Sequence, residues 1–145
     1  MDGSTTPLLA RRVLYEGALL RVGHVVARPA SADRIEVEAP RENVLALPIA
    51  GLFARHGAAR RPTIATSSHG VFFPAGQPYR MSFPGGVGDE VITLQWTDAA
   101  LAATLPGAAI EESQVLLDPR QLLMRGLLWR RFARGEADEI GRAHV

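Results

Sequence analysis

The chain has 145 residues, of which 47% are hydrophobic and 21% charged, so it can bury the core of one domain and does not have the composition of a disordered segment. A formal net charge of +1 gives no support, by charge alone, for a nucleic-acid-binding surface. The chain contains no cysteine and no lysine, which excludes disulfides, thiolate zinc sites, Schiff-base chemistry and Walker-type phosphate loops.

The chain begins with polar residues, Met1–Pro7, which lack the apolar region of a signal peptide. Short apolar runs rich in Val and Leu follow at Val13–Tyr15 and Leu19–Ala27, with Gly17 between them. Next, Arg34–Glu38 alternates apolar and charged residues. These runs predict three short strands, the last of them half-buried.

The segment Val44–Phe53 is apolar at both sets of alternate positions, which predicts a strand covered on both faces. Pro48 lies inside it, and because proline cannot donate a ladder hydrogen bond, it predicts a bulge or an edge position. The longest apolar run of the chain, Val44–Ala54, is too short to span a bilayer. We therefore expect a soluble, cytoplasmic protein with no membrane partner.

Further runs of β-branched and aromatic residues predict more strands at Thr63–Thr66, Val71–Phe73, Tyr79–Phe83 and Val91–Trp96. The segment 84–89 has the glycine-rich composition of a turn. Short strands separated by Gly and Pro, and followed by helices, are typical of a mainly β domain. We expect a small barrel or jelly roll with helical additions.

The last third of the chain favours helices. Asp98 before an alanine-rich run predicts an N-cap and a short helix, and Ser113–Leu117 is compatible with one more strand. Asp118 and Pro119 supply an N-cap and a proline at the first helical position, which predicts a helix over 119–134 with a glycine stop at 135. We expect residues 1–97 to form the barrel and 98–145 the helical part of the same domain.

The predicted helix over 119–134 is apolar around most of its circumference at 100° per residue. A helix that lies on one surface needs a single apolar stripe, so a second covering surface is expected. The only other predicted helix is short and alanine-rich, and we therefore expect a homodimer. The candidate interface residues are Leu123, Leu127, Leu128, Trp129 and Phe132.

Arginines at positions 125, 130, 131 and 134 of this helix could contact phosphate. No glycine loop accompanies them, and the aromatic residues among them, Trp129 and Phe132, are candidate interface residues. We interpret them as the solvated side of the helix, and we expect Arg130, Arg131 and Arg134 at the rim of the dimer contact.

Several segments together resemble a known family, and their order and spacing carry the resemblance. They are NVLALPIAGLFARH at 43–56, HGVFFPAGQPYR at 69–80, GDE at 88–90, LQW at 94–96, DPRQL at 118–122 and LLWRR at 127–131. Over about residues 10 to 140, the chain resembles the N-terminal sensor domain of AraC-family transcriptional regulators. The resemblance implies a cupin-like β-barrel with C-terminal dimerisation helices, a small-molecule effector and no enzymatic activity. It also implies that DNA binding belongs to a C-terminal helix-turn-helix domain that is missing here.

One departure from metal-binding cupins concerns their second motif, Pro-x-Gly-x-x-His. Here Pro74 and Gly76 match, but Tyr79 stands at the position of the ligand. Tyrosine is a poor ligand for zinc or ferrous iron, so we expect no metal and no cofactor. This argues against a dioxygenase or an isomerase.

The alternative is a cupin-type metalloenzyme with an atypical metal site. The histidines show no close His-x-His pairing, so such a site would need His24, His56 and His69 to converge. The adjacent carboxylates Asp89 and Glu90 would point to opposite faces of a strand, and such a pair is a poor acid–base couple.

The candidate effector-binding residues are polar side chains embedded in the predicted strands. They are His24, Arg55, Tyr79, Arg80, Gln95 and Trp96. Strand alternation does not separate inside from outside where both sets of positions are apolar, and we expect at least half of these side chains to point outward. A third hypothesis is a dimerisation module without an effector, whose barrel is filled by its own side chains.

Overall fold

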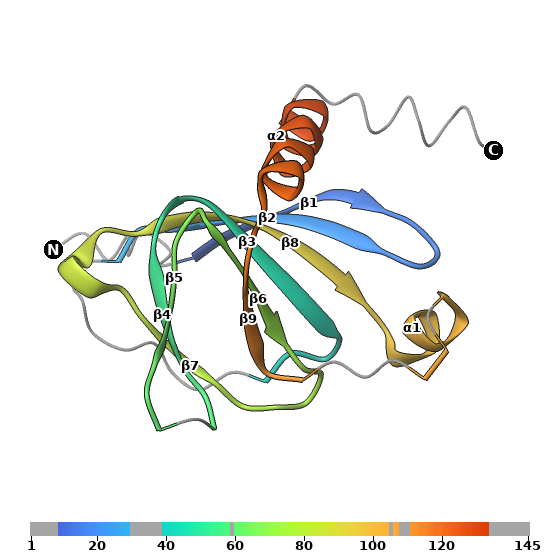
Figure 1. Cartoon of the computed structure of the whole chain (residues 1–145), viewed down its shortest axis with the longest axis horizontal. Coiled ribbons are helices and arrows are strands. Elements are labelled where there is room, and N and C mark those ends of the chain that lie inside the picture. The colour runs from blue at the N-terminus through green and yellow to red at the C-terminus, as the bar shows by residue number, and fades with distance from the viewer. Residues whose placement is uncertain (1–8, 30–38, 59, 105, 108–110, 134–145) are drawn as a thin grey trace, which may run out of the picture.

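The computed structural model describes residues 9–29, 39–58, 60–104, 106–107 and 111–133. Within these residues the chain forms a six-stranded and a three-stranded antiparallel sheet (Figure 1). The large sheet has the order β1 (Leu9–Glu16), β2 (Arg21–Ala27), β8 (Asp89–Trp96), β3 (Asn43–Gly51), β6 (His69–Phe73) and β9 (Ser113–Leu116). The small sheet has the order β5 (Thr63–Ala65), β4 (Phe53–His56) and β7 (Arg80–Ser82).

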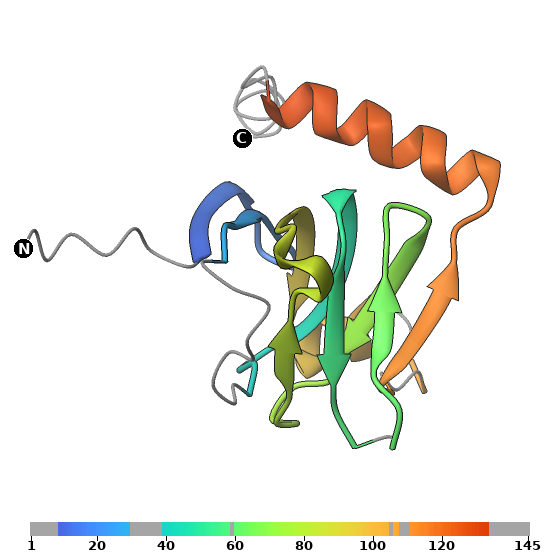
Figure 2. The same ribbon diagram turned by 90° about the vertical axis from the view of Figure 1, so that its left-hand side faces the viewer.

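Three helical segments accompany the sheets: a 3₁₀ turn (Pro84–Gly86), α1 (Asp98–Thr104) and α2 (Pro119–Ala133). Figures 1 and 2 show α2 lying over the side of β1, β2 and β8 that faces away from the small sheet. No helix in the described part of the chain is long and apolar enough to cross a membrane. The predicted mainly β domain with a C-terminal helix is confirmed.

The central strands β3 and β8 of the large sheet are buried on both faces, which explains why β3 is apolar at both sets of positions. Val91 of β8 and Ala46 of β3 belong to the core between the two sheets. Their strand neighbours Ile92 and Leu47 belong to a second core on the opposite face. Because successive side chains point to opposite faces of a strand, a strand covered on both sides needs apolar residues throughout.

The predicted strand Val44–Phe53 is in fact two strands. β3 ends at Gly51, whose φ of 72° lies in the left-handed region, and β4 begins at Phe53 in the other sheet. A side chain at Gly51 would collide with the carbonyl oxygen of Gly88. The chain therefore turns from one sheet to the other at a position that requires glycine.

The bulge predicted at Pro48 is confirmed, because the register with β8 shifts between Pro48 and Ala50. The other predicted strands lie in β1, β2, β5, β6, β7, β8 and β9, except that Arg34–Glu38 falls outside the described residues.

The short helix α1 is present as predicted, but it begins at Asp98, one residue earlier than predicted, and has a different cap. The hydroxyl oxygen of Thr97 accepts a hydrogen bond from the backbone N–H of Ala100 at 3.0 Å, and the Thr97 carbonyl accepts one from Leu101. Thr97 is thus the N-cap, and the prediction of Asp98 is wrong by one residue. Asp98 instead accepts a hydrogen bond at 2.7 Å from the side-chain amide of Asn43 in β3.

The predicted N-cap of α2 is confirmed and is part of a reciprocal capping box. The Asp118 carboxylate accepts from the backbone N–H of Gln121 at 2.8 Å, and the Gln121 side chain accepts from the Asp118 N–H at 2.9 Å. Two otherwise unpaired N–H groups at the helix start are satisfied in this way. The predicted end at 134 and the glycine at 135 lie outside the described residues.

Arg125 fastens the middle of α2 to the sheet. Its Nη1 donates hydrogen bonds to the carbonyl oxygens of Pro48, at 2.9 Å, and of Ser67. Only residues 44–46 of β3 pair with β6, so Pro48 lies outside that ladder, and its carbonyl bonds to Arg125. The interpretation of a solvated side chain is therefore wrong for Arg125, whereas Arg130 and Arg131 are exposed as expected.

Replacing Arg125 tests this anchor. We expect Arg125→Ala to lower the free energy of unfolding by about 1–3 kcal/mol, because two backbone carbonyls lose a charged donor. The matched control is Arg120→Ala, an exposed arginine on the same helix, which we expect to change it by less than about 0.5 kcal/mol. Chemical denaturation measures both values, and equal losses would contradict the anchoring role.

Candidate functional site

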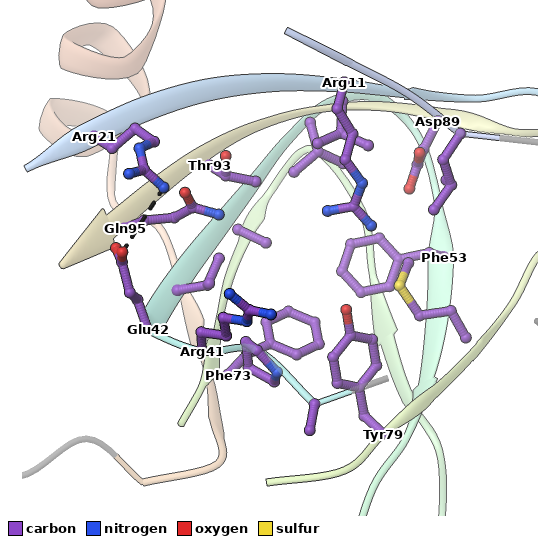
Figure 3. A pocket seen from close by; sticks show the side chains of 18 residues that line it. Arg11, Arg21, Arg41, Glu42, Phe53, Phe73, Tyr79, Asp89, Thr93 and Gln95 are labelled. Carbon is purple, nitrogen blue, oxygen red and sulfur yellow. Dashed lines mark ion pairs between the residues drawn. The ribbon is translucent and has the colours of Figure 1, made fainter. Parts of the chain in front are cut away.

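A cavity of about 680 Å³ lies in the core between the two sheets (Figure 3). Its walls come from β1, β2, β3 and β8 of the large sheet, from the small sheet, from Phe73 and Tyr79, and from the segment 39–42. The volume falls within the range of about 300–1,000 Å³ that is usual for small-molecule sites.

Aromatic rings form one wall of the cavity. Phe53 and Phe73 are almost completely buried, and their ring centroids lie 6.3 Å apart. The Tyr79 ring packs at 4.7 Å from that of Phe73. Tightly packed aromatic rings offer a large apolar surface that needs little rearrangement to receive a ligand.

Five charged side chains also line the cavity, and they are Arg11, Arg21, Arg41, Glu42 and Asp89. Arg21 is paired with Glu16 at 3.0 Å and lies 3.7 Å from Glu42. Arg41 has no ion pair or hydrogen bond with another described residue. Figure 3 shows the guanidinium groups of Arg11 and Arg41 and the hydroxyl of Tyr79 directed toward the same space.

Asp89 is the most unusual of these groups because it is buried, with 6% of its surface exposed. Its Oδ2 has no hydrogen-bond partner among the described residues. Burial raises the pKa of the carboxyl to about 7, and a hydrogen bond from the backbone of Ala27 partly opposes that rise. Near neutral pH this group can therefore either donate or accept a hydrogen bond inside the cavity.

Two of the six candidate residues, Tyr79 and Gln95, line the cavity. Arg80 is exposed on β7, and Trp96 is half-buried at the end of β8, on the opposite side of the strand from Gln95. His24 lies on the outer face, with its ring 4.7 Å from that of Trp129 and its Nε2 3.3 Å from the Glu90 carboxylate.

Arg55 is buried but lies outside the cavity lining, where it connects three segments of the chain. It donates hydrogen bonds to the Phe72 carbonyl at 2.6 Å and to the Thr63 hydroxyl at 3.4 Å. Its Nε lies 3.6 Å from the Glu112 carboxylate. Burial lowers the pKa of Arg55, and the negative charge of Glu112 opposes that shift. These contacts assign Arg55 a structural role.

Sequence reasoning missed most of the polar lining. Asp89, Thr93 and Gln95 alternate along β8 on one face, and Gln95 was the only one of them proposed. A period of two counted back from Gln95 would have found the others. The expectation that Asp89 and Glu90 point to opposite faces is confirmed, because Asp89 lines the cavity and Glu90 contacts His24.

The structure does not bring His24, His56 and His69 together. His56 lies 2.7 Å from the Ser82 hydroxyl in the small sheet, and Nδ1 of His69 accepts a hydrogen bond from the Thr66 backbone at 3.1 Å. Within the described ranges, no three His, Asp or Glu side chains are grouped as metal ligands would be. The convergence that the metalloenzyme alternative needs is therefore not found there.

The buried carboxyl makes stability depend on pH. Its folded-state pKa of about 7 lies above the ordinary value of 3.8, so the folded protein binds more protons than the unfolded chain between these values. The free energy of unfolding should therefore fall as pH rises from about 4 to 7, by at most about 1.4 kcal/mol per pH unit, and then level off. We expect Asp89→Asn to be more stable than the parent at pH 7.5 and to lose this dependence.

Denaturant titrations from pH 4.5 to 8 measure this difference. Glu111→Gln, which neutralises an exposed carboxylate, is the control and should follow the parent. A parent profile that is unchanged by Asp89→Asn would contradict the raised pKa.

No protein-family model matches the chain, and no curated protein is similar to it in sequence. Solved structures are similar, however. The Schizosaccharomyces pombe Cnp3 cupin domain superposes with a TM-score of 0.55 at 16% identity, covering 68% of this chain and 72% of that one. A putative mannose-6-phosphate isomerase from Ralstonia eutropha gives 0.54 at 10% identity, covering 63% and 87%.

The EutQ protein of Clostridium difficile gives a TM-score of 0.52 at 15% identity, covering 61% of this chain and 68% of that one. At such low identities the likeness concerns the fold alone. Two facing antiparallel sheets and these structural neighbours agree, and the chain has the cupin fold with a helix on its C-terminal side.

Proposed function

We propose that this cupin domain is a non-catalytic sensor that binds a small-molecule effector between its two sheets, as part of an AraC-type transcriptional regulator. The observation that carries the proposal is the cavity of about 680 Å³, which joins an aromatic wall to a few converging polar groups. Small-molecule sites usually have this composition. A barrel filled by its own side chains would leave no such space.

The position of β8 between the cavity and α2 supports a coupling between ligand binding and the position of the helix. Thr93 and Gln95 line the cavity on one face of the strand. On the other face, Ile92 belongs to the core against which Trp129 of α2 packs. An effector that binds one arrangement of sheet and helix better than another shifts the population toward it. In a regulator of the AraC type, the position of this helix would then bias the DNA-binding domains.

The outer face of α2 supports dimerisation. Leu123, Met124, Leu127 and Leu128 are 63%, 53%, 52% and 40% exposed. Trp129 and Phe132, which the sequence placed in the candidate interface, pack against the large sheet. Each large apolar side chain left in water forgoes roughly 1.5–3 kcal/mol of burial. A second copy that presents the same leucines would cover them through a two-fold contact.

Filling the cavity tests the sensor proposal. A screen of sugars, aromatic acids, fatty acids and metal ions should yield a compound that raises the melting temperature, since a ligand at 100 times its Kd adds about 2.7 kcal/mol. Val44→Phe, which places a ring in the cavity wall, should abolish that shift. Ile64→Phe, at an exposed position, should retain it. A shift that survives Val44→Phe, or no shift with any compound, would count against the proposal.

Charging the exposed leucines tests the dimer. We expect the parent to sediment as a dimer at tens of micromolar and Leu127→Glu to sediment as a monomer, because two charges would meet in the contact. Leu19→Glu is the matched control, since Leu19 is 53% exposed but lies in the turn between β1 and β2. A monomeric parent would overturn the proposed two-fold contact.

A further inference from the structure

The chemistry of the cavity walls restricts the kind of effector that fits. Polar groups line the cavity along β8: Asp89 and Gln95 lie at its two ends, Thr93 lies between them on the same face, and Arg11 enters from β1. Asp89 and Gln95 are six positions apart, which corresponds to about 20 Å along a strand. Figure 3 shows Arg21 and Gln95 on one side of the cavity, Asp89 on the other, and the rings of Phe73, Tyr79 and Phe53 between them.

The end near Gln95 favours an anion. Arg21, Arg41 and Glu42 line it. Arg21 is already paired with Glu16 and lies near Glu42. Arg41 makes no ion pair with another residue that the structure describes. A guanidinium group presents parallel N–H donors that match a carboxylate in bidentate geometry, and the Gln95 amide adds a further donor.

The Asp89 end favours a group that donates a hydrogen bond. Oδ2 of Asp89 is buried and unpartnered among the described residues, and an unsatisfied buried acceptor is costly. A hydroxyl group suits this position in particular. It donates to an ionised carboxylate and accepts from a protonated one, so it fits either state of a group with a pKa of about 7.

Between the two ends most of the lining side chains are apolar, and Thr93 and Arg11 are the polar ones. Phe53, Phe73 and Met81 line this middle part together with the Tyr79 ring. A ligand body that is hydrocarbon or aromatic would bury its surface there without leaving polar groups unpaired. A sugar would instead place several hydroxyls against these side chains.

Resting on the sensor function proposed above, we propose that the effector is an elongated carboxylic acid with an apolar body and a hydroxyl group at the far end. Its carboxylate binds Arg41 and Gln95, its body lies against the aromatic wall, and its hydroxyl reaches Asp89. Both ends are needed for tight binding, because each one satisfies a group that the protein leaves without a described partner.

The experiment compares matched compounds by calorimetry at pH 7. The compounds are 10-hydroxydecanoate, which when extended and hydrogen-bonded at both ends spans about 20 Å, decanoate and 1,10-decanediol. We expect the hydroxy acid to bind about tenfold or more tightly than the alcohol that lacks the carboxylate. We also expect it to bind more tightly than the acid that lacks the hydroxyl.

Two variants locate the ends of the ligand. Arg41→Met should weaken the binding of the hydroxy acid about tenfold or more and leave the binding of the neutral alcohol unchanged. The control is Arg80→Met, at an exposed arginine outside the cavity, which should change the affinity for either compound by no more than about twofold. Asp89→Ala, which removes both carboxyl oxygens, should reduce the advantage of the hydroxy acid over the plain acid. Circular dichroism and melting curves confirm that each variant is folded.

Several results would overturn this assignment. Alcohols that bind as tightly as the acids, preferential binding of amines or sugars, or equal effects of Arg41→Met and Arg80→Met would reject the carboxylate class and leave the sensor function standing. If neither these compounds nor any member of the wider screen binds, both proposals fail.

Discussion

Neighbouring side chains of β8 point into two different hydrophobic cores, one on each face of the sheet, and the rest of the molecule depends on this burial of both faces. Val91 contributes to the core between the sheets, and Ile92 to the core under α2. A sheet covered on both faces requires a second sheet on one side and a helix on the other. The cavity and α2 therefore lie on opposite faces of the same strand, β8.

The same constraint decides which part of α2 is free. Its half-buried positions, Leu122, Arg125, Gly126, Trp129 and Phe132, follow one stripe of the helix and meet the sheet. The capping box at Asp118 fixes where the helix starts, and Arg125 fixes its middle through the carbonyls of Pro48 and Ser67. The leucines on the opposite stripe remain outside and give the proposed dimer its surface.

The sequence predicted the strands, the bulge at Pro48 and the cap at Asp118 because these features depend on residues close together in the chain. It did not predict the anchor at Arg125, whose partner Pro48 lies 77 positions away. The cavity was only partly predicted, because alternation reveals the inner face of a strand only when the outer face is polar. In β8 the period of two shows that Asp89, Thr93 and Gln95 share a face but not that this face lines a cavity, so Gln95 was found while Asp89 and Thr93 were missed.

The most direct measurement is a methyl NMR titration with the tightest-binding compound of the screen. If the ligand lies between the sheets, its protons will show intermolecular nuclear Overhauser effects to the methyl groups of Val44 and Val91, which line the cavity. The methyl group of Ile92, one residue away on the opposite face, will show none. Effects confined to Ile92 or to the exposed leucines of α2 would place the ligand outside the barrel and contradict the account.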